Sequence, residues 1–75
     1  MIETIFGLVL KEIRTESKIS QEKLAEYCNL DRTYISLLER GLRQPTITTI
    51  FKLSKALGIT PSELVKKIEI RYENQ

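Results

Sequence analysis

The chain has 75 residues, one cysteine, no histidine and a formal net charge of +2. A single cysteine excludes an intrachain disulfide, and the lack of histidine argues against a structural zinc site, so we predict no metal and no cofactor. So short a chain buries only a modest core, which leaves tight helix packing and oligomerisation to stabilise it. Without a basic leader or a long apolar run, we expect one cytoplasmic domain over residues 1–75 with no membrane attachment.

Residues 4–17 are predicted to form the first helix. Its apolar positions follow the helical spacing i, i+3, i+4, i+7 and are Phe6, Val9, Leu10 and Ile13. Gly7 weakens the first turn slightly, and Arg14 lies beside the apolar stripe.

The most informative stretch runs from Ser20 to Gly41 and predicts two short helices joined by a tight turn. Ser20 is a good N-cap for the first of them, and Asn29 tolerates the left-handed conformation that often ends a helix. Asp31 is expected to cap the second helix, residues 32–40, and Gly41 to end it. Cys28 is interpreted as a small buried hydrophobe, because no histidine is present to pair with its thiol.

The helix predicted over residues 32–40 has two different faces at 100° per residue. The polar and basic arc contains Arg32, Thr33, Ser36, Leu37 and Arg40. The mostly apolar arc contains Tyr34, Ile35, Leu38 and Glu39. Such a helix can be anchored on one side while it probes a groove with the other.

Two further helices complete the predicted fold. Thr46 caps a helix that ends at Gly58, and the side chains expected to be buried from it are Ile47, Ile50, Leu53, Ser54 and Leu57, with Phe51 at the margin. The sequence Thr-Pro-Ser-Glu at 60–63 is a capping box with proline at the first helical position. Beyond it, residues 68–72 alternate with period two, so a short strand and a fraying helix remain equally acceptable.

Positive charge gathers in the middle of the chain. Residues 31–55 carry five basic and two acidic side chains, whereas residues 1–30 have a net charge of −1 and residues 56–75 a net charge of zero. This distribution is typical of a face that binds a polyanion.

Three motifs carry a specific resemblance: S-Q-E-x-L-A, then N-L-D-R-T-Y-I-S, then E-R-G. They are similar to the helix-turn-helix of the phage-repressor class, which includes 434 repressor and Cro, and to the small controller proteins of restriction–modification systems. The likeness continues through R-Q-P-T-I and K-A-L-G-I. It implies an all-α, five-helix fold in which residues 32–40 enter the major groove of double-stranded DNA.

The resemblance also implies roles for single residues. Base-reading candidates are Arg32, Thr33, Ser36 and Leu37: arginine can bond guanine with two donors, and an apolar side chain can touch a thymine methyl group. Phosphate-binding candidates are Gln21, Tyr34, Arg40, Arg43 and Gln44. Tyr34 is expected to pack at the helix edge and offer its hydroxyl, and the other four are equally acceptable as plain surface residues. Arg14 and Glu39 match a structural ion pair of the family.

Residues 61–75 are interpreted as a dimerisation segment. Its apolar side chains exceed what so small a domain needs to bury, and with one residue of the preceding helix the predicted interface consists of Phe51, Val65, Ile68, Ile70 and Tyr72. The alternative is that these residues close the core of one protomer. Family members pair two reading helices on near-palindromic sites, which favours the homodimer.

The sequence therefore predicts a sequence-specific DNA-binding regulator that acts as a homodimer, such as a restriction–modification controller protein. An antitoxin, a phage-type repressor or a module of a larger regulator would use the same binding mode. A helical protein-interaction module without DNA binding is the alternative from another class. No nucleophile elbow, phosphate loop or metal-ligand cluster supports an enzyme, and no small-molecule ligand is predicted.

Overall fold

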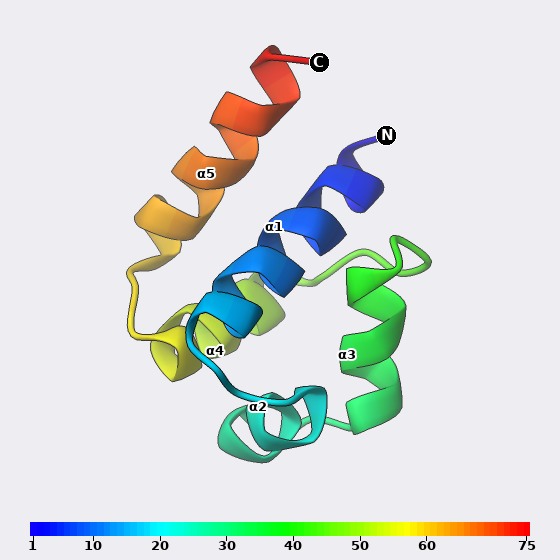
Figure 1. Cartoon of the computed structure of the whole chain (residues 1–75), viewed down its shortest axis with the longest axis vertical. Coiled ribbons are helices and arrows are strands. Elements are labelled where there is room, and N and C mark those ends of the chain that lie inside the picture. Colours follow the sequence, from blue (N-terminus) through cyan, green and yellow to red (C-terminus); the bar gives the residue numbers. More distant parts are fainter.

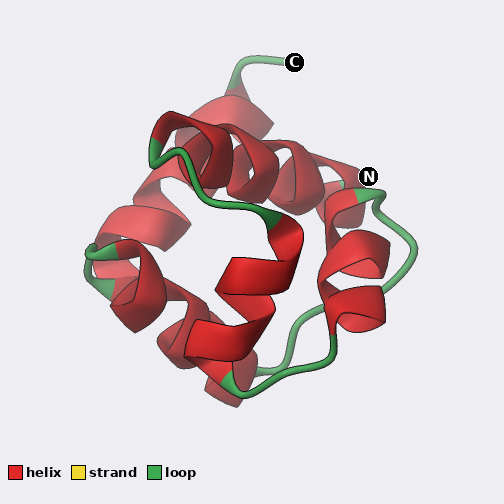
Figure 2. Ribbon diagram, turned by 60° about the horizontal axis from the view of Figure 1, so that its bottom comes forward, coloured by secondary structure: helices red, strands yellow, loops and turns green.

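The computed structural model describes all of residues 1–75 as five helices without a strand. They are α1 (Ile2–Glu16), α2 (Gln21–Cys28), α3 (Arg32–Glu39), α4 (Ile47–Leu57) and α5 (Pro61–Glu73). In Figure 1, α1 lies between α5 and α3, while α2 and α4 close the lower end of the molecule. Figure 2 shows helices and short connections only, which confirms the all-α prediction.

Most helix ends follow the predicted local chemistry. The hydroxyls of Ser20, Thr46 and Thr60 each accept a first-turn backbone N–H. Asn29, Gly41 and Gly58 adopt the left-handed conformation, with φ angles of 55°, 74° and 74°. Asp31 occupies the predicted N-cap position of α3, although its side chain makes no capping hydrogen bond.

The capping box of α5 is complete. Thr60 accepts the backbone N–H of Glu63 at 3.0 Å, and the Glu63 carboxylate accepts the backbone N–H of Thr60 at 2.7 Å. The backbone N–H of Thr60 first, and then its side chain, hold the pKa of Glu63 below its usual value, because they favour the charged carboxylate.

All five helices contribute to one core of thirteen apolar side chains. Six of them are fully buried: Leu10, Leu24, Ile35, Leu38, Leu53 and Leu64. Burying leucine and isoleucine contributes about 1.5–3 kcal/mol per side chain, which makes this cluster the main source of stability.

The buried face of α4 differs from the prediction. Ile47 is 69% exposed, and the buried positions of this helix are Thr49, Leu53 and Ser54. Ile50 and Leu57 are only partly buried against the core. The buried Thr49 hydroxyl is not left without polar partners, because the hydroxyl groups of Thr46 and Tyr34 lie 2.9 Å and 3.5 Å from it.

The last segment is a helix through Glu73, so the strand alternative for residues 68–72 is wrong. Leu64 and Ile68, four residues apart, are both buried in the core and fix the helical phase. Ile70 then falls on the outer side and is 47% exposed.

Gly7 has a packing role that the sequence alone did not reveal. A Cβ atom at this position would lie 2.5 Å from the Leu38 carbonyl oxygen and 2.6 Å from that of Glu39. The absence of a side chain therefore lets α1 lie directly against the backbone of the last turn of α3.

We expect Gly7→Ala to lower the free energy of unfolding by about 1–3 kcal/mol, because the added methyl group overpacks a contact between backbones. This result would oppose helix propensity, which favours alanine by about 1 kcal/mol. Gly58→Asn is the control, since its Cβ meets nothing within 4 Å and asparagine accepts the left-handed conformation. Urea unfolding measures both variants, and a more stable Gly7→Ala protein would contradict the packing role.

Candidate nucleic-acid interface

α2 and α3 form a helix-turn-helix. The left-handed Asn29 ends α2, and the backbone N–H of Leu30 donates to the Ala25 carbonyl at 2.8 Å. Two residues later α3 begins, and it packs against both α1 and α2. The turn thus follows the sequence prediction closely.

The predicted reading arc of α3 lies on the solvent side of the helix. Arg32, Thr33 and Arg40 are exposed, and Ser36 and Leu37 are partly exposed. The opposite side is anchored, because Ile35 and Leu38 are fully buried in the core. α3 consequently presents polar and basic side chains outward while two apolar side chains hold it in place.

A buried ion pair fixes the last turn of α3. The Arg14 guanidinium donates to Glu39 with two nitrogens, Nε to Oε2 at 2.6 Å and Nη2 to Oε1 at 3.1 Å. Both side chains are shielded, with exposures of 11% and 2%. Arg14 also donates through Nη1 to the Ile19 carbonyl at 2.8 Å, so it joins α3 to the α1–α2 connection as well. The expected Arg14–Glu39 pair is present as a two-pronged contact.

Gln21 joins this ion pair, which the sequence analysis missed. Its Nε2 donates to Glu39 Oε1 at 2.9 Å. Gln21 is the first residue of α2, and its side chain is half-buried. We call Arg14, Gln21 and Glu39 the anchor cluster, since it connects α1, α2 and α3 by side-chain hydrogen bonds. No local signal in the sequence distinguishes this role from the expected phosphate contact.

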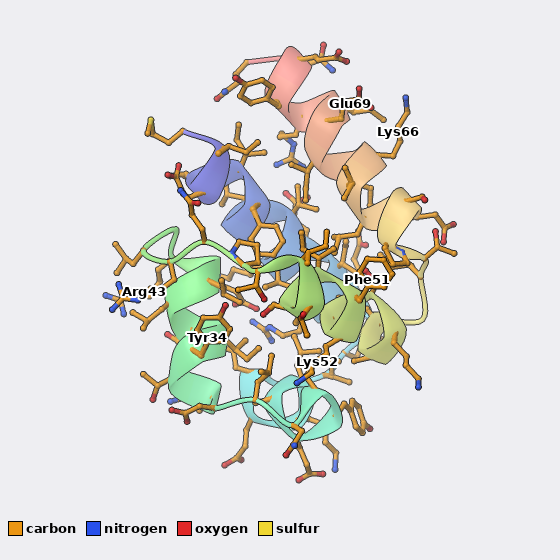
Figure 3. All side chains as sticks on the ribbon, turned by 180° about the vertical axis from the view of Figure 1, so that it is seen from behind. Tyr34, Arg43, Phe51, Lys52, Lys66 and Glu69 are labelled. Atoms are coloured by element: carbon orange, nitrogen blue, oxygen red, sulfur yellow. The ribbon has the colours of Figure 1, made fainter.

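The loop after α3 is held at both ends. The backbone N–H of Leu42 donates to the Leu37 carbonyl at 2.9 Å, in the hydrogen-bonding pattern of a glycine-terminated helix. Arg43 and Gln44 are exposed, as a phosphate contact requires, and Figure 3 shows Arg43 extending away from the body. Gln44 Nε2 donates to Glu3 Oε2 at 2.9 Å. The pKa of Glu3 lies below its usual value, because its own backbone N–H first, and then the Gln44 amide, favour the charged carboxylate.

Tyr34 lies at the edge between α3 and α4. It is half-buried against the core, and its hydroxyl group is 3.5 Å from the Thr49 hydroxyl. This placement agrees with the expected packing at the helix edge, while its phosphate contact stays a prediction.

Cys28 lies in the core and has the environment of a buried hydrophobe. Its Sγ donates to the Lys52 carbonyl at 3.6 Å, and burial raises the pKa of the thiol. The thiol is therefore held in its protonated form, which is a poor nucleophile.

The residues predicted for the dimer interface do not share one surface. Phe51, Val65 and Tyr72 are exposed by 57%, 48% and 54%. Ile68 is buried in the protomer's own core, because it follows Leu64 by one helical turn, so it is not an interface side chain. Ile70 lies on the other flank of α5, in a hollow beside Val9 of α1.

A further exposed apolar side chain, from α4, lies beside Phe51 and Val65, where Ile68 and Ile70 do not. Ile47, which we expected in the core, lines a shallow hollow together with both residues. Val65 also lines an adjoining hollow with Ile2, the first residue of α1. The exposed apolar surface is thus formed by α4 and α5, with the start of α1 at its border.

The comparison with known proteins decides the family. A helix-turn-helix family model matches residues 10–64, which is most of the chain. The chain belongs to this helix-turn-helix family of DNA-binding regulators. It is 49% identical over 65 residues to the control protein C.BamHI of Bacillus amyloliquefaciens, covering 85% of this chain and 80% of that protein. It is 45% identical over 69 residues to the control protein C.MunI of a Mycoplasma species, covering 91% and 93%.

Solved structures agree with this assignment. The restriction-modification controller protein C.AhdI from Aeromonas hydrophila superimposes with a TM-score of 0.79 at 46% identity, over 81% of this chain and 92% of that chain. The wild-type controller protein C.Esp1396I gives a TM-score of 0.90 at 32% identity, over 100% and 97%. No helix of the present chain has the length and apolar character needed to cross a membrane.

We expect Glu39→Gln to lower the free energy of unfolding by about 1–3 kcal/mol, because Arg14 keeps its charge in a shielded site but loses the carboxylate. Glu12→Gln is the matched control. Its ion pair with Arg71 has the same N–O distance of 2.6 Å, but the side chains are 54% and 43% exposed, so we expect a loss below about 1 kcal/mol. If both variants lose the same free energy of unfolding in chemical denaturation, burial does not make the Arg14–Glu39 pair more stabilising than an exposed ion pair.

Proposed function

We propose that this protein is a sequence-specific transcription regulator that binds a near-palindromic operator as a homodimer, in the manner of a restriction–modification controller protein. The observation that carries the proposal is the division of α3. Arg32, Thr33 and Ser36 lie on the solvent side, while Ile35 and Leu38 are fully buried. The controller proteins among its relatives, matched over most of their length, supply the biological context.

In the proposed complex, α3 lies in the major groove. Arg32 and Thr33, in its first turn, read base edges, and Ser36 and Leu37 follow one turn later. Contacts to the sugar–phosphate backbone come from Gln21 at the start of α2 and from Arg43 and Gln44 in the loop after α3, with Arg40 and Tyr34 at the margins. Basic charge from Arg32, Arg40 and Arg43 on this side complements the duplex.

The homodimer is proposed on the apolar surface of α4 and α5. A single reading helix spans few base pairs, and two copies related by a twofold axis would read two half-sites one DNA turn apart. Ile47, Phe51 and Val65 supply the exposed apolar area for such a contact. Burial of this area in a dimer would also add stability to a small domain.

A phage-type repressor is a second candidate with the same binding mode. The immunity repressor of Bacillus phage phi105 is 38% identical over 69 residues, which are 92% of this chain but 48% of that protein. Selection of bound duplexes from a random pool would give the operator. A site in front of an adjacent endonuclease gene supports the controller assignment, and a site in a prophage control region supports the repressor.

We expect Arg32→Ala to weaken binding to the selected operator by about 1–3 kcal/mol and to relax the preference at one base-pair position. Arg43→Ala should instead weaken binding to all sequences alike and lower the number of counterions released on binding by about one. Fluorescence anisotropy across a salt series measures both, with Lys67→Ala on α5 as the control. If wild-type binding does not respond to salt, the protein-interaction alternative is favoured over DNA binding.

We expect Val65→Glu to yield monomers in sedimentation velocity, because a carboxylate would be buried in the proposed interface without a partner. Leu8→Glu is the matched control, since Leu8 is also apolar and is 46% exposed against 48% for Val65, but lies on α1. If Val65→Glu still forms dimers like the wild type, the interface lies elsewhere.

A further inference from the structure

Phe51 separates two hollows of different charge on the α4–α5 face. The first hollow lies between Phe51 and α5, and its charged residues are Lys66 and Glu69. The second lies on the other side of Phe51, and its charged residues are Lys52 and Lys55. Figure 3 shows this order directly, with Glu69 and Lys66 on one side of Phe51 and Lys52 on the other.

The two flanks of Phe51 differ in what their charges contact. The four ion pairs of the protomer leave Lys52 and Lys55 unpaired, and no carboxylate lines their hollow. Glu69 is paired with Lys66 at 3.5 Å, but the two side chains are 53% and 68% exposed. A pair so exposed is weak, which leaves the Glu69 carboxylate free to accept another cation.

We propose that these flanks recognise each other across the homodimer: Lys52 and Lys55 of one protomer bind the partner's Glu69, with Phe51 near the twofold axis. This inference rests on the homodimer proposed above and adds the charges that set its register. In an isologous interface, each contact occurs twice, so a flank that offers the Glu69 carboxylate and a flank that offers two lysines are self-complementary around an apolar centre. The centre is supplied by Ile47, Phe51 and Val65.

A second copy of this chain suits the surface because the face carries both members of the charge pair. The same charges oppose wrong partners, since a related regulator with a basic residue at the position of Glu69 would meet two lysines. The contact between the two lysines and the partner's Glu69 therefore determines which partner binds and in which register. The apolar centre contributes most of the affinity.

The test is a charge exchange measured without DNA by sedimentation equilibrium. Glu69→Lys alone should raise the dimer dissociation constant about tenfold or more, because like charges then meet twice. The double variant Lys52→Glu, Lys55→Glu should raise the dissociation constant similarly, because its new carboxylates then face the partner's Glu69. An equimolar mixture of the two variant chains should form a heterodimer within about threefold of the wild-type dissociation constant, because both contacts then join opposite charges.

Salt gives a readout that a folding defect would not reproduce. Screening should strengthen self-association of each charge-reversed chain and weaken that of the wild type. The control variants are Glu73→Lys, which changes the charge as Glu69→Lys does, and Lys67→Glu, which makes half the charge change of the double variant; neither residue lines a hollow beside Phe51. Both should dimerise like the wild type, and thermal melts identify any variant that fails to fold.

The outcomes separate this inference from the proposed function. If the wild type is a monomer at every concentration, the homodimer itself is refuted. If the wild type dimerises but Glu69→Lys dimerises equally well, or if the mixture shows no preferential heterodimer, the dimer stands and the proposed register is overturned.

Discussion

The position of α3 depends on the buried contact between Arg14 and Glu39. α3 has eight residues, and an isolated helix of that length is unstable in water, so its position must come from its neighbours. Ile35 and Leu38 attach it to the core, and the missing side chain of Gly7 lets its last turn approach α1. Glu39 then fixes its rotation, because the carboxylate accepts hydrogen bonds from α1 and α2 at once.

The excess positive charge of residues 31–55 is divided between two surfaces. Arg32, Arg40 and Arg43 belong to α3 and its loop, whereas Lys52 and Lys55 lie on α4 beside Phe51. Composition alone assigns all five to one polyanion-binding face. In the proposed assembly, the arginines meet DNA and the lysines meet the second protomer. A basic cluster in the sequence therefore need not mark a single interface, because successive helices point its members in different directions.

The sequence predicted best what depends on neighbouring residues. Three hydroxyl caps, three left-handed helix ends and the turn between α2 and α3 follow from local backbone chemistry. The errors concern contacts between distant segments. Ile47 fits the apolar arc of α4 but is exposed, while Thr49 is buried and its hydroxyl lies near that of Tyr34, fifteen residues earlier in the chain. The roles of Gly7 and Gln21 likewise depend on residues of α3 that no local pattern brings near them.

The place of Gln21 in the anchor cluster is compatible with a phosphate contact. A glutamine amide has two N–H donors, and the bond from Nε2 to Glu39 uses one of them. The other donor remains free at the first position of α2, where the helix dipole also favours an anion. Glu39 would then hold the amide in the orientation that presents this donor to the phosphate. The carboxylate that fixes α3 would thus also orient the Gln21 amide toward a DNA phosphate. The base-reading residues of α3 and the phosphate contact of α2 would then keep a constant spacing.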